Sequence, residues 1–529
     1  MNVKKYWRIY VLIIVTIISL TIIFSPAIPV LDINQDEMQV SENQSWDQKY
    51  MNLQYSIELA GGTRIRAPIV GATAENAIVN DNEIEDLEQK IADDFEDTSF
   101  RDVTISEMDE DDDDNNKYIE ITSSNADEDV LRDSLNNHNI EYDFVRSGVT
   151  PNTQENMVDI IQDRLDEAGL TGSNVRIVTL SDDTNVILAE VPDASRERTI
   201  SLIQERGDVS VQIYHSETDD GSYTQEVVLT QDDFRTIGTA NAESERQPPH
   251  VPVVINSDVA EQFQDRAVET GLARSGGSMC QYEQNPESTQ PCLLTVVDGE
   301  VVDSSGMASN LANSMVQGTW ASDPSFIIQT STYEEAQDLS INLRSGSLPA
   351  ELDISSGEVT FVSAQQGEQF RYIAVLIGLL STLVVATSIS LRYGKIKIAA
   401  PMMITASAEV IILLAIASLM NYPIDIAVIA GFVAVIGTGV DDLIIIADQV
   451  MGGENPAESK LIFDKRFKKA LWIILGAAGT TILALGPLAI LELNELQGFA
   501  IFTILGVIAG VLLTRPAYGD MLRILFTEK

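Results

Sequence analysis

Long apolar runs alternate with polar segments along this chain of 529 residues, and six of the runs have the length of a membrane span. A helix of roughly 20 apolar residues crosses the ~30 Å hydrocarbon core of a bilayer. The runs cover residues 10–30, 370–391, 398–420, 424–447, 470–491 and 499–514. The pattern predicts a polytopic α-helical membrane protein.

The first run resembles a signal peptide in its flanks, because Lys4, Lys5 and Arg8 precede it and the residues "SPA" lie near its end. It is longer than the apolar core of a cleaved signal, which has about 7–15 residues. We therefore expect a retained membrane anchor.

The basic residues of the short loops predict the orientation of the spans, because cytoplasmic loops are enriched in Lys and Arg. Basic residues occur in segments 1–9, 392–397, 448–469 and 515–529, whereas the turns after the third and fifth spans have none. We expect a multi-pass protein of the cell membrane, surrounded by membrane lipid, with both termini in the cytoplasm. Residues 31–369 then form a large external domain.

Residues 31–369 change from continuous apolar runs to short strands and amphipathic helices. Met157, Ile161 and Leu165 recur at helical spacing, and Val186 to Val191 alternates like a half-buried strand. Repeated units of this kind predict ferredoxin-like modules in an α+β domain. The sequence shows no nucleophile motif, phosphate-binding loop or metal-ligand spacing, so we expect no enzymatic activity, no cofactor and no metal.

Acidic residues dominate the polar part of the chain, and the formal net charge is -47. Between residues 31 and 369 the lysines are Lys49, Lys90 and Lys117. Concentrated salt shortens the Debye length to about 3 Å at 1 M and would screen the repulsion, so the composition favours a halophilic source. The same charge makes nucleic acid a poor partner.

Two cysteines, Cys280 and Cys292, flank a polar stretch of the external domain. A disulfide between them is expected if the domain faces an oxidising compartment, and unpaired thiols are the alternative. A metal or catalytic role is disfavoured, because the histidines of the chain are scattered.

Ionisable residues inside spans are costly and are functional candidates. Asp441 and Asp442 lie in the fourth span and Glu409 lies in the third. Residues 372–391 of the second span and all of spans three to six contain no Lys or Arg, so we expect the carboxylates to be protonated or to meet a cation from a partner. Both cases suit an ion-coupling site, and a purely structural hydrogen-bonded acid is the alternative.

Small residues surround these acids on the fourth span, and a face of small residues allows close helix packing. They include Gly431, Gly437, Thr438 and Gly439, and Gly431 and Thr438 share a stripe with Asp441. We expect this face to pack against another helix.

Several motifs occur in an order that resembles the SecD/SecF family of protein-export proteins, within the resistance-nodulation-division superfamily. They are "SIELAGGTRI" (56–65), "QDRLDEAGL" (162–170), "LLTVVDGEVV" (293–302), "LSINLRSGSLP" (339–349), "GTGVDDLIIIAD" (437–448) and "TRP" (514–516). Together they cover nearly the whole chain.

The resemblance implies a subunit that works with a SecF-type membrane protein beside a SecYE-type translocon channel. It implies that Asp441 couples a proton gradient to the export of unfolded polypeptide, and that the partner contributes a cation. The halophilic composition leaves sodium as an alternative to the proton. It also divides the external domain into a base, at about residues 50–215 and 332–369, and a mobile head, at about 216–331. The alternatives are half of an exporter of lipids or small molecules, and a passive scaffold of the translocon.

Overall fold

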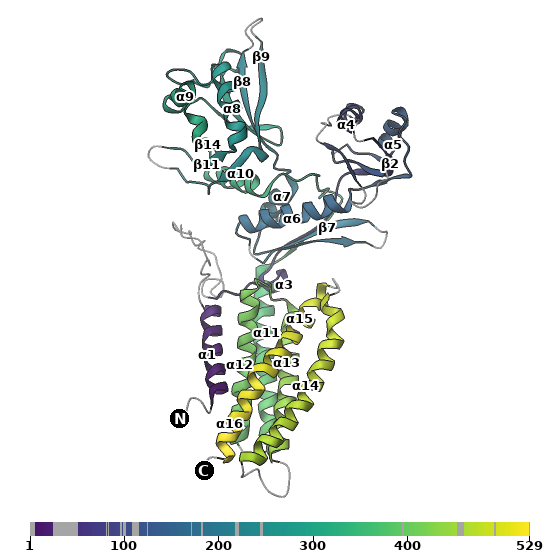
Figure 1. The fold of residues 1–529 in the computed structure, drawn as a ribbon, viewed down its shortest axis with the longest axis vertical. Coiled ribbons are helices and arrows are strands. Elements are labelled where there is room, and N and C mark those ends of the chain that lie inside the picture. Colours follow the sequence, from purple (N-terminus) through teal and green to yellow (C-terminus); the bar gives the residue numbers. More distant parts are fainter. Residues whose placement is uncertain are drawn as a thin grey trace. The chain divides into compact units, whose positions relative to one another are not determined.

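The computed structural model of this protein describes most of the chain. The described residues are 6–24, 51–80, 82, 84–95, 98, 102–107, 116–123, 125–170, 172–180, 184–216, 222–243, 247–393, 396–451, 460–490 and 494–527. The chain forms two compact units: residues 1–62 with 361–529, here called the membrane bundle, and residues 63–360, here called the β-rich domain. Figure 1 shows the helices of the first unit and the mixed helices and strands of the second.

The membrane bundle has, within the described residues, six helices that are long and apolar enough to cross a bilayer, as the sequence predicts. They are α1 (Trp7–Phe24), α11 (Ala364–Tyr393), α12 (Ile396–Leu419), α13 (Ile426–Met451), α14 (Lys460–Ile490), and a last helix made of α15 (Asn494–Ala509), a π-helical turn (Gly510–Thr514) and α16 (Arg515–Thr527). A short helix, α3 (Ile57–Ala60), contacts α11. Helix α13 contacts each of the helices from α11 to α16, so its side chains are the best placed to meet those of other spans.

The last helix continues to Thr527, whereas the sequence predicts a span that ends at residue 514. The apolar run is interrupted there by Arg515 and Pro516. Beyond the interruption, Tyr518 and Leu522 are fully buried in the core of the bundle. The helix continues because the charge of Arg515 is neutralised inside the protein, as shown below.

The base of the β-rich domain is a ferredoxin-like fold, as the sequence predicts. Its sheet has the order β15-β1-β7-β6, and the chain runs through it as β1-α6-β6-β7-α7-β15. The elements are β1 (Gly62–Pro68), α6 (Pro151–Glu167), β6 (Asn174–Thr179), β7 (Asn185–Pro192), α7 (Arg196–Gln204) and β15 (Glu358–Val362). Helix α6 begins where the Thr150 hydroxyl accepts a hydrogen bond from the Thr153 amide and Pro151 occupies the first turn.

A second ferredoxin-like unit, here called the N-terminal module, is inserted between β1 and α6 of the base. Its sheet has the order β3-β4-β2-β5, with antiparallel neighbours throughout. The elements are β2 (Ala72–Ile78), α4 (Ile84–Asp93), β3 (Val103–Glu107), β4 (Asn116–Ile121), α5 (Glu128–Asn137) and β5 (Phe144–Ser147). Ile119 and Ile121 of β4 pack against Leu131 and Leu135 of α5 in a common core, which leaves Glu120 on the other face of the sheet.

The head is inserted between α7 and β15 of the base. It has the sheets β13-β12-β8-β9 and β10-β11-β14. Its strands are β8 (Val209–Ser216), β9 (Tyr223–Thr230), β10 (Phe234–Ile237), β11 (His250–Ile255), β12 (Cys292–Val297), β13 (Glu300–Ser305) and β14 (Ser325–Gln329), and its main helices are α8 (Ser257–Glu269), α9 (Ser309–Val316) and α10 (Tyr333–Ser345). One core extends from Val209 to Leu343, so the head exceeds the expected range of 216–331 at both ends.

Cys280 and Cys292 form a disulfide in the head. Cys292 begins β12, and its neighbours Leu294 and Val296 are buried with it. The bridge closes the polar stretch between the two cysteines against the sheet.

We expect Asp303→Asn to stabilise the head near pH 7 and to have little effect near pH 4. Burial raises the pKa of the Asp303 carboxyl on β13 from 3.8 to about 6, and Glu283 and Glu335 add to the rise. An acid whose pKa is higher in the folded chain than in the unfolded chain destabilises the fold increasingly as pH rises from about 4 to 6. Thermal unfolding of the purified protein at both pH values measures the difference.

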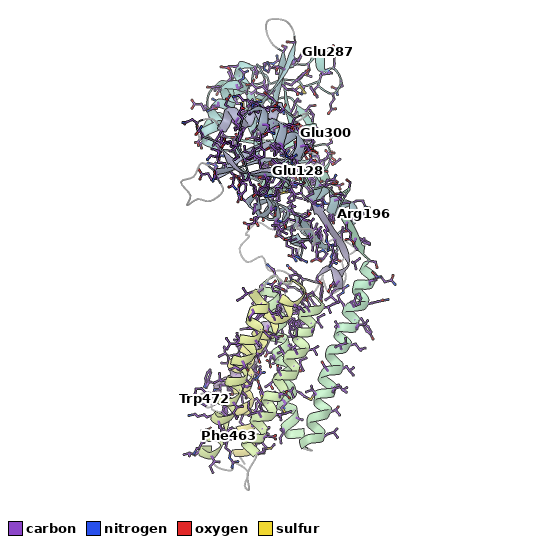
Figure 2. The ribbon with its side chains drawn as sticks, turned by 90° about the vertical axis from the view of Figure 1, so that its right-hand side faces the viewer. Glu128, Arg196, Glu287, Glu300, Phe463 and Trp472 are labelled. Carbon is purple, nitrogen blue, oxygen red and sulfur yellow. A yellow bond between two sulfur atoms is a disulfide. The ribbon has the colours of Figure 1, made fainter. Side chains whose placement is uncertain are left out.

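The matched control is Glu300→Gln, because Glu300 begins the same strand and is exposed (Figure 2). An equal gain in melting temperature for Asp303→Asn at both pH values would contradict the prediction, since the gain should follow the ionisation of Asp303.

Candidate functional site

A buried arginine joins two carboxylates inside the membrane bundle. Helix α12 contributes Glu409, α13 contributes Asp442, and α16 begins with Arg515. Arg515 Nη1 lies 2.7 Å from Glu409 Oε1, and Arg515 Nε lies 3.2 Å from Asp442 Oδ2. The side chains of Arg515, Glu409 and Asp442 are 1%, 3% and 18% exposed. The charge of each side chain is therefore compensated by the other two side chains and hardly by water.

A threonine and two glycines complete the surroundings of the guanidinium. The Thr514 hydroxyl accepts a hydrogen bond from Arg515 Nη1 at 2.9 Å and donates one to Glu409 Oε2 at 3.3 Å. A Cβ at Gly510 would lie 1.5 Å from Arg515 Nη1, and a Cβ at Gly439 would lie 3.3 Å from both Arg515 Nη2 and Glu409 Oε2. These two glycines make room for the arginine.

The π-helical turn explains how Arg515 reaches into the bundle. It spans Gly510–Thr514, directly before Arg515. Pro516 follows and cannot donate a main-chain hydrogen bond, which favours a local departure from α-helical pairing. Such π-turns are frequent at functional sites.

The expectation that this chain places no cation beside its intramembrane carboxylates is wrong. Arg515 follows the last apolar run, and we assigned it to the cytoplasmic tail because a hydropathy pattern ends at the first strong charge. The signal that could have revealed it is the apolar spacing beyond it, where Ala517, Met521 and Leu522 continue a helical pattern.

Asp441 is on a different face of α13 from Asp442. Asp441, Thr438 and Gly437 are exposed on the surface of the bundle, and a Cβ added at Gly437 would have no described atom of another residue within 4 Å. Gly431 instead packs within this chain, where a Cβ would lie 3.2 Å from the Phe499 carbonyl oxygen. The predicted small-residue face is therefore divided, and the part with Asp441 is not covered by the described residues.

The charges of this site do not balance among the residues that the structure describes. Glu409 and Asp442 contribute two negative charges when ionised, and Arg515 contributes one positive charge. A buried uncompensated charge is unfavourable, so the group is best stabilised when it also holds one proton or one small cation. The arrangement is chemically suited to take up and release such an ion.

A second buried arginine holds the junction between the base and the head. Arg164 of α6 is fully buried and donates to carbonyl oxygens of both chain segments that connect the two parts. Its partners are Leu202 O at 3.4 Å, Glu205 O at 2.5 Å and Arg206 O on the outgoing segment, and Gly346 O at 2.9 Å and Ser345 Oγ at 3.3 Å on the returning segment.

Burial lowers the pKa of the Arg164 guanidinium to about 10, so the group remains charged at neutral pH. The close approach requires glycine at position 207, because a Cβ there would lie 2.6 Å from Arg164 Nη2 and its φ is 68°. The sequence does not predict this junction, and the two connecting segments that Arg164 joins are here called the hinge.

Comparison with known families and relatives gives consistent matches. The family model "Protein export membrane protein SecD/SecF, C-terminal" matches residues 347–515. The protein-export membrane protein SecD of Haloquadratum walsbyi is 44% identical over 528 residues, covering 99% of this chain and 99% of that protein. The SecD protein of Haloferax volcanii is 43% identical over 536 residues, covering 100% of this chain and 99% of that protein.

A solved structure also aligns with this chain. It is the crystal structure of SecDF from Thermus, described as a translocon-associated membrane protein, with a TM-score of 0.48 and 16% identity. The alignment covers 99% of this chain and 59% of that chain.

Proposed function

Because this chain belongs to the SecD family of protein-export membrane proteins, we propose that it uses an ion gradient to promote the export of unfolded polypeptide. The family assigns it an accessory role in protein export. In our proposal it is not an enzyme, and it works with a SecF-type subunit beside a SecYE-type channel. A proton or a sodium ion passes along Asp441, Asp442 and Glu409 during each cycle.

The observation that carries this proposal is the buried charge imbalance around Arg515. One guanidinium faces two carboxylates, and the pair with Glu409 is almost completely shielded from solvent. A site that only joined helices would be more stable with equal charges, or with apolar residues of similar size. The excess negative charge supports ion uptake.

The exposed face of α13 supports the expected partner. Asp441 and Thr438 lie there without cover from the described residues, and a bare carboxylate facing lipid is costly. Helices α11 and α14 are also largely uncovered, and Trp472 of α14 is 75% exposed (Figure 2). In our proposal the SecF-type subunit covers Asp441 and brings it a hydrogen-bond donor or a cation.

The proposed topology places both termini in the cytoplasm and the β-rich domain outside the cell. The basic loops of the sequence support this orientation. The β-rich domain would hold the emerging polypeptide, and the head would move about the junction held by Arg164.

We expect Asp442→Asn to slow export while the protein remains at normal abundance. The substitution preserves shape and the contact with Arg515, but it removes the charge imbalance on which ion uptake depends. Asp441→Asn should also slow export, because it removes the carboxylate that faces the partner. Secretion of a pulse-labelled exported protein, in cells whose only copy carries the variant, is the measurement.

Asp464→Asn is the matched control. Asp464 is a half-exposed residue of α14 that lies 3.9 Å from Arg523, so its loss should leave export unchanged. Unchanged export in both Asp442→Asn and Asp441→Asn, with normal abundance of each, would contradict ion coupling and leave the scaffold interpretation.

A further inference from the structure

A large cavity lies in the β-rich domain beside the hinge between the base and the head. Its volume is about 1160 Å³. Its walls include Thr104 and Glu120 from the N-terminal module, Ser201 from α7, and Arg206, Asp298 and Leu348 from around the hinge. It is larger than most small-molecule pockets, which occupy about 300–1,000 Å³, so it has room for several residues of an extended chain.

The lining of this cavity is strongly acidic. Among the described residues, seven carboxylates and one cation, Arg206, line it. That cation is already engaged, because Arg206 Nη1 lies 2.7 Å from Asp102 Oδ1 and its other nitrogens donate to Leu348 O at 3.3 Å and Pro349 O at 3.2 Å. The cavity therefore attracts cationic groups.

Halophilic surface chemistry does not account for one of these carboxylates. Glu120 is 1% exposed, whereas acids that adapt a protein to salt face the solvent. Glu120 Oε2 accepts hydrogen bonds from the hydroxyls of Thr150 at 2.8 Å and Thr153 at 2.9 Å. Glu120 Oε1 is buried and has no hydrogen-bond partner among the described residues.

The unpaired oxygen of Glu120 has a physical cost. A buried acceptor without a donor costs about 1–3 kcal/mol, and more when it is charged. The nearby cation Arg146 does not donate a hydrogen bond to Glu120 Oε1. Its Nε donates to Glu75 Oε1 at 2.6 Å. A donor brought by a ligand would satisfy this oxygen.

The cross-strand neighbours of Glu120 are small residues. Glu120 is paired across the sheet with Thr104 of β3 and Thr73 of β2, and both neighbours are small. The Thr73 hydroxyl donates its hydrogen bond to Gly148 O and therefore not to the Glu120 carboxylate. On this face of the sheet the carboxylate therefore lies between the buried Thr73 and the exposed Thr104, which lines the cavity.

We infer that the hinge cavity binds an arginine- or lysine-bearing segment of an unfolded polypeptide, with Glu120 as the buried counter-charge. This inference rests on the proposed function, because it names the part of the exported chain that the β-rich domain holds. A guanidinium or ammonium group in the cavity would donate to Glu120 Oε1 once the carboxylate turns toward it, because this oxygen is buried in the unliganded protein. The surrounding carboxylates would attract further basic residues of the same segment.

The position of the cavity connects occupancy to the hinge. Asp298, in the turn between β12 and β13 of the head, accepts hydrogen bonds from the amides of Gly207 at 3.0 Å and Asp208 at 2.8 Å. The same Asp298 lines the cavity. A bound cation that competes for its carboxylate would loosen the head from the outgoing hinge segment.

The test uses full-length protein in lipid nanodiscs at about 1 M salt, where charges beyond ~3 Å are screened and buried contacts persist. The probe is a labelled extended peptide in which arginine alternates with serine, and the matched probe has citrulline in place of arginine. The wild-type protein should bind the arginine peptide more tightly. Glu120→Gln should weaken that binding roughly tenfold or more, since it removes one charge-assisted hydrogen bond.

Two control variants keep the test decisive. Glu300→Gln removes an exposed carboxylate outside the cavity and should bind as the wild type does. Thr104→Arg places a guanidinium beside Glu120 from the neighbouring strand, so it should block the peptide even if Glu120→Gln folds poorly.

Several results would overturn the inference. They are equal binding of the arginine and citrulline peptides, unchanged binding by Glu120→Gln and Thr104→Arg, or guanidinium ion alone binding as tightly as the peptide. Asp441→Asn should bind the peptide normally, because its effect is on ion coupling. The peptide-binding assay thus tests the cavity inference, and the secretion assay separately tests the proposed function. Either one can fail without the other.

Discussion

Cells whose only copy of this protein carries Arg515→Met are expected to lose most of the protein from the membrane and to export slowly. Methionine leaves Glu409 and Asp442 buried without their cation. Removing one partner of a buried ion pair typically costs about 3–5 kcal/mol, because the remaining charge has no compensation. Quantitative immunoblotting of membranes, together with pulse-labelled secretion, measures both effects.

A combined variant separates stability from ion coupling. Arg515→Met together with Glu409→Gln and Asp442→Asn removes all three charges, so abundance should recover while export remains slow. Arg523→Met is the matched control, because Arg523 is on the same helix but is more exposed. Normal abundance and export in the single Arg515→Met variant would show that the buried pair has neither role.

The Arg164→Met variant is expected to unfold at a lower temperature and to expose the hinge to solvent. The substitution removes hydrogen bonds to four main-chain carbonyls on two separate segments. We expect a loss of roughly 3 kcal/mol or more in the free energy of unfolding, since the carbonyls of Leu202, Glu205 and Gly346 would lose this buried donor. Hydrogen exchange should increase first at residues 202–208 and 343–348.

The control for this effect is Arg198→Met on the neighbouring helix α7. Arg198 lies 2.6 Å from Asp338, but both side chains are about one-third exposed, so the pair contributes at most ~1 kcal/mol. Equal changes in hydrogen exchange for Arg164→Met and Arg198→Met would mean that Arg164 stabilises the hinge no more than a surface ion pair does.

The sequence was sufficient for the number of spans and for the ferredoxin-like character of the β-rich domain. Span length and strand periodicity are local properties, so they can be found from neighbouring residues alone. The bounds of the head within the base were harder to predict from the sequence. Val209 and Leu343 lie in one core although more than a hundred residues separate them, and only tertiary packing brings them together.

The site was predicted in part. Glu409 and Asp442 were among the expected residues, because carboxylates inside apolar runs are conspicuous. Arg515 was missed because its burial depends on the π-helical turn and on the space left by Gly439 and Gly510. The resemblance assigned ion coupling to Asp441, but helical spacing gives only the angle between Asp441 and Asp442 and not which of them faces the interior.

The two insertions in the base have a consequence for the order of folding. Strands β1 and β15 are neighbours in the sheet, yet almost the whole β-rich domain is synthesised between them. The N-terminal module and the head each have their own core and can form before that strand pair closes. At the head, Leu348 N donates to Arg206 O at 2.8 Å, so a folded insert brings its two ends together and little loop entropy remains to be lost. We therefore expect the sheet of the base to be completed last, after both inserts have formed.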